Sequence, residues 1–214
     1  TPLNSIIGFS ELLLDPYFET EQQLEFVNTI KQNGNNLLAI INDIMDISQI
    51  ESGQITLRKE QFTVDRLMGE IVHEQALSLR AKGLEMRIKK PENNIIVTGD
   101  SGRIKQILSN FISNAIKFTD KGYIEVGCQE EPGNTIQFYV KDSGIGIPKE
   151  YHHKIFERFR QVETALTRKY GGNGLGLTIA RQLAERMGGH LWLESTPGEG
   201  SIFYISIPLK SIDI

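Results

Sequence analysis

The feature that most constrains this chain is a set of apolar and small residues that recurs every three or four positions between residues 27 and 48. The repeat consists of Val27, Ile30, Gly34, Leu37, Ile41, Ile44 and Ser48. Because a 3,4 spacing returns to one side of an α-helix, it predicts a helix over about residues 21–51 with one continuous apolar seam. Leu38 and Met45 widen this seam, so the helix needs a partner that covers it.

A shorter helix is expected before the long one. Residues 1–14 keep helical spacing, and Asp15-Pro16 interrupts it. The two helices predict a hairpin over residues 1–53 that ends at Gly53. Two helices of this kind expose too much apolar surface to stand alone, so we expect a second copy to complete a dimeric four-helix bundle. The alternative is an intramolecular hairpin that packs on the rest of the chain.

Glycine is distributed unevenly along the chain. Of 20 glycines, 10 lie between residues 142 and 200, and only two lie in residues 1–52. After residue 53, strand and helix patterns mix. We expect strands near 55–58, 85–88, 95–97, 123–128, 135–141, 190–194 and 201–207, and helices over 64–81, 101–118, 149–156 and 175–187. The chain is therefore predicted to be α+β, with the hairpin followed by a two-layer α/β sandwich over residues 54–214.

Charge and cysteine content exclude several classes of protein. The net charge is −4 and the sequence pI is about 5.6, so nucleic acid is disfavoured as the main partner. Cys128 is the single cysteine, which excludes an internal disulfide framework. No apolar run approaches the roughly 18 residues that span a bilayer. We expect this segment to be cytoplasmic and not to cross the membrane, which is compatible with a longer, membrane-anchored protein.

Five polar residues form one stripe on the helix predicted over residues 101–118. They are Arg103, Gln106, Asn110, Asn114 and Lys117. Asparagine is a poor helix former in mid-helix, so two asparagines one turn apart require a reason. Amide oxygens suit a hard cation such as Mg²⁺ that is shared with nucleotide phosphates, and Lys117 suits a phosphate. The alternative is an ordinary solvated face.

An acidic residue follows the strand predicted over residues 135–141. Apolar residues occupy its even-numbered positions, which should face the core. Asp142 continues this parity and should point inward, where a carboxylate is costly without a partner. It could accept a hydrogen bond from the amino group of adenine, while Gly144 and Gly146 let the backbone approach a flat base. The alternative is an aspartate that caps a turn.

Two further glycine-rich segments follow. Gly171-Gly172-Asn173-Gly174-Leu175-Gly176-Leu177 runs into a predicted helix, whose N-terminal N–H groups can bind an anion. The segment matches neither the Rossmann nor the P-loop pattern. Gly198-Glu199-Gly200 predicts a tight turn between the last two strands. Taken alone, the first segment is as typical of a flexible loop and the second of a simple hairpin.

The order and spacing of these segments resemble the catalytic domain of sensor histidine kinases. Residues 110–118 resemble the asparagine box of that family, 142–147 its first glycine box, 156–159 its phenylalanine box, 172–177 its second glycine box and 198–201 its third. Asn173 stands where threonine is commoner. Residues 1–8 resemble the tail of the histidine box. The resemblance covers almost the whole chain.

The resemblance implies that residues 54–209 bind ATP and Mg²⁺. Asn114, together with Asn110, would hold the metal, and Lys117 would contact a phosphate, so Asn110 and Lys117 are the candidate catalytic residues of this chain. Asp142 would read adenine. The remaining nucleotide contacts would come from Phe118, Gly144, Gly146, Ile147, Arg168, Gly172, Gly174, Leu175 and Gly176, with a lid over about residues 161–171.

The family transfers the γ-phosphoryl group of ATP to a histidine on the hairpin and then to an aspartate of a response-regulator receiver domain. The resemblance puts that histidine four residues before Thr1, so we expect the chain as given to bind ATP without labelling itself. Thr1 matches a position that the family links to dephosphorylation of the receiver.

Two other functions are disfavoured. ATPases of the gyrase and chaperone kind carry a glutamate at the position of Asn110, where it activates water. An amide offers no general base, which disfavours hydrolysis and favours transfer to another acceptor. A module that holds nucleotide without transfer is disfavoured by the intact boxes.

Overall fold

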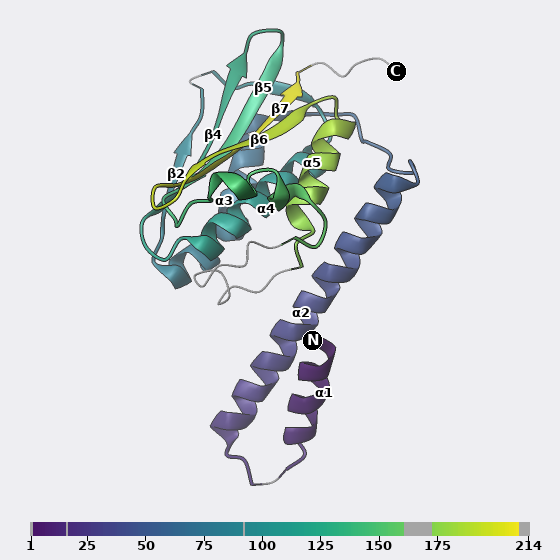
Figure 1. Ribbon diagram of the computed structural model, residues 1–214, viewed down its shortest axis with the longest axis vertical. Coiled ribbons are helices and arrows are strands. Elements are labelled where there is room, and N and C mark those ends of the chain that lie inside the picture. The colour runs from purple at the N-terminus through teal and green to yellow at the C-terminus, as the bar shows by residue number, and fades with distance from the viewer. Residues whose placement is uncertain (1, 16, 92, 161–172, 210–214) are drawn as a thin grey trace. The chain divides into compact units, whose positions relative to one another are not determined.

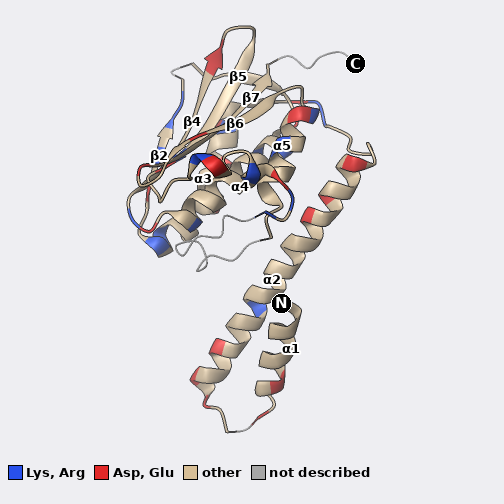
Figure 2. Cartoon of the chain, in the orientation of Figure 1, with Lys and Arg blue, Asp and Glu red and all other residues tan. Residues whose placement is uncertain are grey.

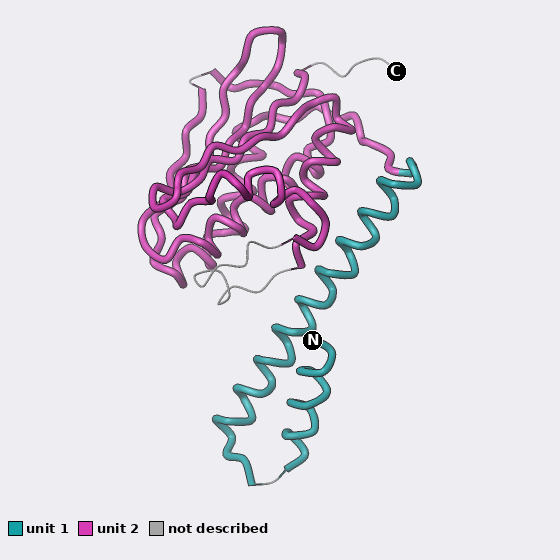
Figure 3. Tube along the Cα trace, viewed as in Figure 1, with its two compact units in different colours: residues 1–54 teal, residues 55–214 magenta. Residues whose placement is uncertain are grey.

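The computed structural model describes residues 2–15, 17–91, 93–160 and 173–209. The chain divides into two compact units, residues 1–54 and residues 55–214, which Figure 3 colours separately. Within the described ranges, none of the helices combines the length and apolar character needed to cross a membrane.

Unit 1 is a helical hairpin. Helix α1 spans Pro2–Leu12 and α2 spans Thr20–Glu51, and the two run antiparallel (Figure 1). The long helix begins where Gln22 Oε1 accepts the N–H of Glu19 at 3.1 Å, which caps its first turn. It is followed by Gly53 in a left-handed conformation. The predicted hairpin and the extent of its long helix are therefore confirmed.

The hairpin leaves apolar side chains uncovered in a single chain. On α2, six large apolar residues are between 45% and 60% exposed: Leu24, Val27, Leu38, Ile41, Ile44 and Met45. They include part of the predicted seam and the two residues that widen it. Contiguous apolar surface of this kind is typical of an interface rather than of a solvated helix.

Unit 2 is built on a five-stranded sheet in the order β2-β4-β5-β7-β6. The strands are β2 (Glu85–Lys89), β4 (Tyr123–Glu131), β5 (Thr135–Asp142), β6 (His190–Thr196) and β7 (Gly200–Pro208). Among the described strands of this sheet, only the β2–β4 pair is parallel. A separate antiparallel pair joins β1 (Glu60–Thr63) and β3 (Ile96–Gly99).

Three helices cover one face of this sheet (Figure 1). They are α3 (Val64–Lys82), α4 (Ser101–Phe118) and α5 (Gly176–Arg186). Every even-numbered residue of β5 is buried, and Phe111 of α4 packs against Phe203 of β7 with ring centroids 5.3 Å apart. The hydrophobic core thus lies between the helices and the sheet, which confirms the predicted two-layer sandwich.

Two expected elements differ from the structure. Residues 55–58 are not a strand, because β1 begins at Glu60 opposite the end of β3, and the N–H of Arg58 donates instead to Asp100 Oδ2 at 2.9 Å. The helix expected over residues 149–156 is two 3₁₀ turns, η1 (Lys149–Tyr151) and η2 (Lys154–Phe156). Directly after η1, the Nε2 atom of His152 lies 2.9 Å from the carbonyl oxygen of Ile147.

Charged residues of both signs are scattered over the elements of unit 2 (Figure 2). Some join neighbouring helices: Lys105 of α4 pairs with Glu70 of α3 at 3.6 Å and also with Glu74. Such partly exposed pairs contribute at most about 1 kcal/mol each. The packing of α3 on α4 therefore depends mainly on the buried apolar side chains between them.

Aromatic rings cross the face of the sheet that the helices leave open. Trp192 stacks on Tyr204 with centroids 5.0 Å apart, and Tyr204 lies 6.1 Å from Tyr139. The Tyr139 hydroxyl donates to Glu125 Oε1 at 3.0 Å, and its ring covers Gly127. Because Gly127 has no side chain, the Tyr139 ring can pack directly on its backbone.

Gly127→Ala should lower the free energy of unfolding by about 1–2 kcal/mol, because the added methyl group would lie 2.2 Å from Tyr139 Cζ and displace the ring. Urea denaturation followed by circular dichroism measures the change. In a Tyr139→Leu background the same substitution should cost less than half as much. Equal costs in the two backgrounds would contradict this account.

Candidate functional site

Helix α4 presents a polar stripe at the edge of the core. Its apolar side is fully buried, whereas all five residues of the predicted stripe are half-buried: Arg103, Gln106, Asn110, Asn114 and Lys117. Asp100 is the N-cap of the helix, and its Oδ1 accepts the N–H of Arg103 at 3.0 Å. The stripe is therefore held on a rigid element and is neither core nor fully solvated surface.

Asn110 joins α4 to the start of α5. Its Nδ2 donates to the carbonyl of Gly176 at 3.1 Å, and a Cβ at residue 176 would lie 3.4 Å from Asn110 Cγ. This bond uses the amide nitrogen and leaves Asn110 Oδ1 to other partners. The asparagine stripe and the second glycine segment, 66 residues apart in sequence, therefore lie side by side.

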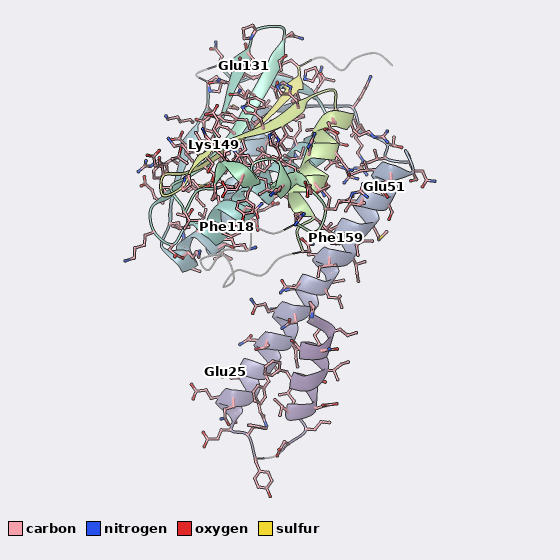
Figure 4. The ribbon with its side chains drawn as sticks, in the orientation of Figure 1. Glu25, Glu51, Phe118, Glu131, Lys149 and Phe159 are labelled. Carbon is pink, nitrogen blue, oxygen red and sulfur yellow. The ribbon has the colours of Figure 1, made fainter. Side chains whose placement is uncertain are left out.

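Lys117 and Phe118 form the last turn of α4, where Figure 4 labels Phe118. The ammonium of Lys117 lies 4.8 Å from the centroid of the Phe118 ring. Burial lowers the pKa of Lys117, because a desolvated ammonium is disfavoured. A phosphate oxygen next to this ammonium would compensate for the lost water.

Asp142 is a buried carboxylate at the end of β5, with 5% of its surface exposed. Its Oδ1 accepts the N–H of Gly144 at 2.8 Å, and the backbone of Ser201 supplies a second hydrogen bond. Burial raises the pKa of Asp142, and the two backbone bonds partly oppose this. The inward direction predicted from the parity of β5 is confirmed.

Two glycines after Asp142 are required by close packing. A Cβ at Gly144 would lie 2.4 Å from the carbonyl oxygen of Phe118 and 2.8 Å from Asp142 Oδ1. Gly146 has φ +67°, and a Cβ there would lie 2.0 Å from the carbonyl oxygen of Thr196. The first glycine segment therefore packs with its backbone directly on its neighbours.

The same segment is clamped from two sides. The N–H of Ile145 donates to the carbonyl of Phe118 at 3.2 Å, and the N–H of Ile147 donates to Ser195 Oγ at 2.8 Å. Ser195 Oγ also lies 2.9 Å from Ser201 Oγ. Neither serine is predicted by residue spacing, because their proximity depends on the pairing of β6 with β7 and of β7 with β5.

The second glycine segment leads into α5. Gly174 has a positive φ, and its carbonyl accepts the N–H of Phe159 at 3.1 Å. The helix starts at Gly176, one residue later than predicted, and Leu175 is its N-cap with a fully buried side chain. Thr1, Arg168 and Gly172 lie outside the described residues, as does the entire lid expected over residues 161–171.

The asparagines, Lys117 and Phe118 therefore lie along one helix. From Asn110 to Phe118 this helix advances about 12 Å along its axis. At its C-terminal end it meets Gly144, which follows the buried carboxylate. No group of three or more His, Cys, Asp or Glu side chains in the described ranges could hold a metal ion. The side-chain oxygens of Asn110 and Asn114 are amide oxygens, a ligand type that Mg²⁺ accepts.

Two family models match the chain. Residues 1–53 match the His Kinase A (phospho-acceptor) domain, and residues 99–211 match the histidine kinase-, DNA gyrase B- and HSP90-like ATPases. The second match covers more than half of the 214 residues. The chain belongs to the sensor histidine kinases. Both parts of the resemblance seen in the sequence are thereby confirmed.

Named histidine kinases align with nearly all of this kinase segment. The signal transduction histidine-protein kinase BarA of Escherichia coli K12 is 40% identical over 98% of this chain, and the circadian input-output histidine kinase CikA of Synechococcus elongatus is 39% identical over 99%. The chain spans only 23% and 29% of their lengths.

Solved histidine kinases share its fold. Full-length ShkA in complex with AMPPNP has a TM-score of 0.79 and 27% identity, and the match covers 100% of this chain and 44% of ShkA. ThkA in complex with the response regulator protein TrrA has a TM-score of 0.77 and 25% identity, over 99% of this chain and 58% of that chain.

Gly144→Ala should destabilise unit 2 of this kinase segment by about 2–3 kcal/mol, because the new methyl group collides with a backbone carbonyl that cannot move aside. Urea denaturation measures the effect. The matched control is Gly69→Ala in α3, where a Cβ meets nothing within 4 Å and should stabilise by about 0.5–1 kcal/mol. A Gly144 variant as stable as wild type would refute the close contact.

Proposed function

We propose that this chain is the ATP-binding and phosphotransfer core of a sensor histidine kinase, with residues 1–53 as the dimerisation and phosphotransfer hairpin and residues 54–214 as the catalytic domain. The observation that carries the proposal is the buried carboxylate of Asp142 at the end of β5, because the Gly144 that follows it packs on the C-terminal end of α4, the helix that bears two half-buried asparagines. Such an arrangement offers separate contacts to the two ends of one nucleotide.

At the base end, Asp142 accepts a hydrogen bond from the exocyclic amino group of adenine. Its bonds to the backbone of Gly144 and Ser201 keep the carboxylate in place before the base arrives. Gly144, Gly146 and Ile147 supply backbone close to the ring plane, and Phe118 lines the pocket. The carboxylate selects adenine over guanine, because adenine has an amino donor at the position where guanine has a carbonyl oxygen.

At the phosphate end, Asn114 and Asn110 hold Mg²⁺ through their amide oxygens, and Lys117 contacts a phosphate. The hydrogen bond from Asn110 Nδ2 to the carbonyl of Gly176 supports this role, because it uses the amide nitrogen and leaves the amide oxygen for the metal. Bound Mg²⁺ neutralises phosphate charge. The backbone of Gly174 and the N-terminus of α5 at Gly176 would add further N–H donors near the phosphates, and Leu175, whose N–H donates to Asn173 Oδ1 at 3.3 Å, would hold the turn between them.

The proposed reaction transfers the γ-phosphoryl group of ATP to a histidine imidazole and then to an aspartate of a response-regulator receiver domain. In the first step the bond from the γ-phosphorus to the oxygen of ADP breaks as a phosphorus–nitrogen bond forms. Asn110 cannot accept a proton from water, which favours transfer over hydrolysis. The core acts in the cytoplasm, where ATP is available.

Asp142→Asn should weaken binding of Mg²⁺–AMPPNP by about 100-fold, because an amide keeps one acceptor oxygen, so its NH₂ group would face either a backbone N–H or the amino group of adenine. Titration calorimetry on the 214-residue chain measures the affinity. The matched control is Glu199→Gln, an exposed carboxylate in the β6–β7 turn, which should bind as wild type. Tight binding by the Asp142 variant would overturn the proposal.

Stability gives a second test of Asp142. Burial raises the pKa of the Asp142 carboxyl group. The contribution of this group to the free energy of unfolding is therefore complete below its unfolded-state pKa, and it is lost as the pH rises through its folded-state pKa. Asp142→Asn has no such ionisation. Its thermal midpoint relative to wild type should therefore improve from about pH 4 to about pH 7. If the thermal midpoint of the variant relative to wild type fell between these pH values, burial would not destabilise the ionised Asp142 carboxylate.

We also propose that the hairpin forms a homodimer through α2. Leu38→Glu with Ile41→Glu should weaken self-association by at least about 100-fold, because two carboxylates would enter the apolar interface. Sedimentation equilibrium measures this. Leu77→Glu, at an 80% exposed position on α3, is the matched control and should leave the dimer intact. Unchanged dimerisation of the double variant would exclude this face.

A further inference from the structure

The C-terminal end of α4 lacks the usual backbone cap. Helix α3 ends in the common way, since Gly83 has φ +67° and its N–H donates to the carbonyls of Arg80 and Leu79. After α4, by contrast, Thr119 is extended, with φ −113° and ψ 111°. The last carbonyls of α4 therefore need donors from elsewhere in the fold.

Lys82, the last residue of α3, supplies those donors. Its Nζ donates to the carbonyls of Ile116 at 2.6 Å, Lys117 at 3.1 Å and Thr119 at 3.1 Å. An ammonium has three N–H bonds, and all three are used here. Asp120 Oδ1 lies 3.9 Å from the same nitrogen. One side chain thus caps the helix that carries the asparagine stripe.

This cap leaves one carbonyl for the nucleotide site. The carbonyl of Phe118 lies between those that Lys82 binds and accepts the N–H of Ile145 instead. A glycine cap would turn the chain back onto the helix, whereas the extended Thr119 lets the end of α4 face Gly144. The lysine cap and the contact of α4 with the first glycine segment therefore belong to one arrangement.

We propose that Lys82 is a positioning residue for ATP, which acts by holding the last turn of α4, and with it Lys117 and Phe118, against the first glycine segment. The inference rests on the proposed function. A fixed positive charge suits this place, because the C-terminus of a helix carries partial negative charge. A methionine of similar length fills the same space but donates no hydrogen bond, which leaves three carbonyls without their donor.

The test is titration calorimetry of the 214-residue chain with Mg²⁺–AMPPNP. Lys82→Met should bind about tenfold more weakly than wild type. Lys82→Arg, which keeps the charge and several donors, should restore binding to within about threefold. Lys82→Gln keeps two donors without the charge, should fold even if the methionine variant does not, and should bind with intermediate affinity.

Two controls separate positioning from general destabilisation. Lys121→Met removes an exposed lysine from the turn that follows α4 and should bind as wild type. Ile71→Val removes one methylene from a fully buried residue of α3, lowers stability and should leave affinity unchanged. Thermal midpoints from circular dichroism compare the stability of all variants.

The outcomes distinguish the two proposals. Wild type that gives no binding heat overturns the proposed function and this inference with it. Wild type that binds, with Lys82→Met and Lys82→Gln within twofold of it, overturns the role of Lys82 alone. The same follows if Ile71→Val weakens binding as much as Lys82→Met does, or if Lys82→Arg gives no rescue.

Discussion

A direct backbone contact between the end of α4 and the turn after β5 organises the whole site. The carbonyl of Phe118 accepts the N–H of Ile145, and Gly144 packs so close to that carbonyl that no Cβ fits. The turn that makes this contact also supplies one of the N–H groups to Asp142. A single closely packed junction therefore joins the asparagine stripe to the buried carboxylate.

Features that depend on neighbours in sequence could be predicted, and features that depend on the pairing of distant segments could not. The bounds of α4 and the inward direction of Asp142 followed from the periodicity of buried residues, which is local. The roles of Lys82 and Ser195 could not be predicted, because their partners are distant in sequence. Lys82 binds the carbonyl of Ile116, 34 residues away, and Ser195 accepts the N–H of Ile147, 48 residues away. The absent strand at residues 55–58 has the same cause, since only the register of β3 decides where β1 begins.

Unit 1 illustrates the same division between local and distant information. The 3,4 repeat on α2 predicts a helix, and the helix forms as expected. The repeat does not identify the surface that covers Leu38, Ile41 and Met45, which are exposed in the single chain. The family match to a phospho-acceptor domain supports a second copy as that surface.

The aromatic rings on the open face of the sheet have a practical consequence. Trp192 is the single tryptophan of the chain, and it stacks on Tyr204 in the middle of two paired strands of unit 2. Its intrinsic fluorescence is therefore an optical probe that belongs to the α/β unit alone. Selective excitation of this indole follows the melting of the sheet without a signal from the helical hairpin, and no label has to be introduced.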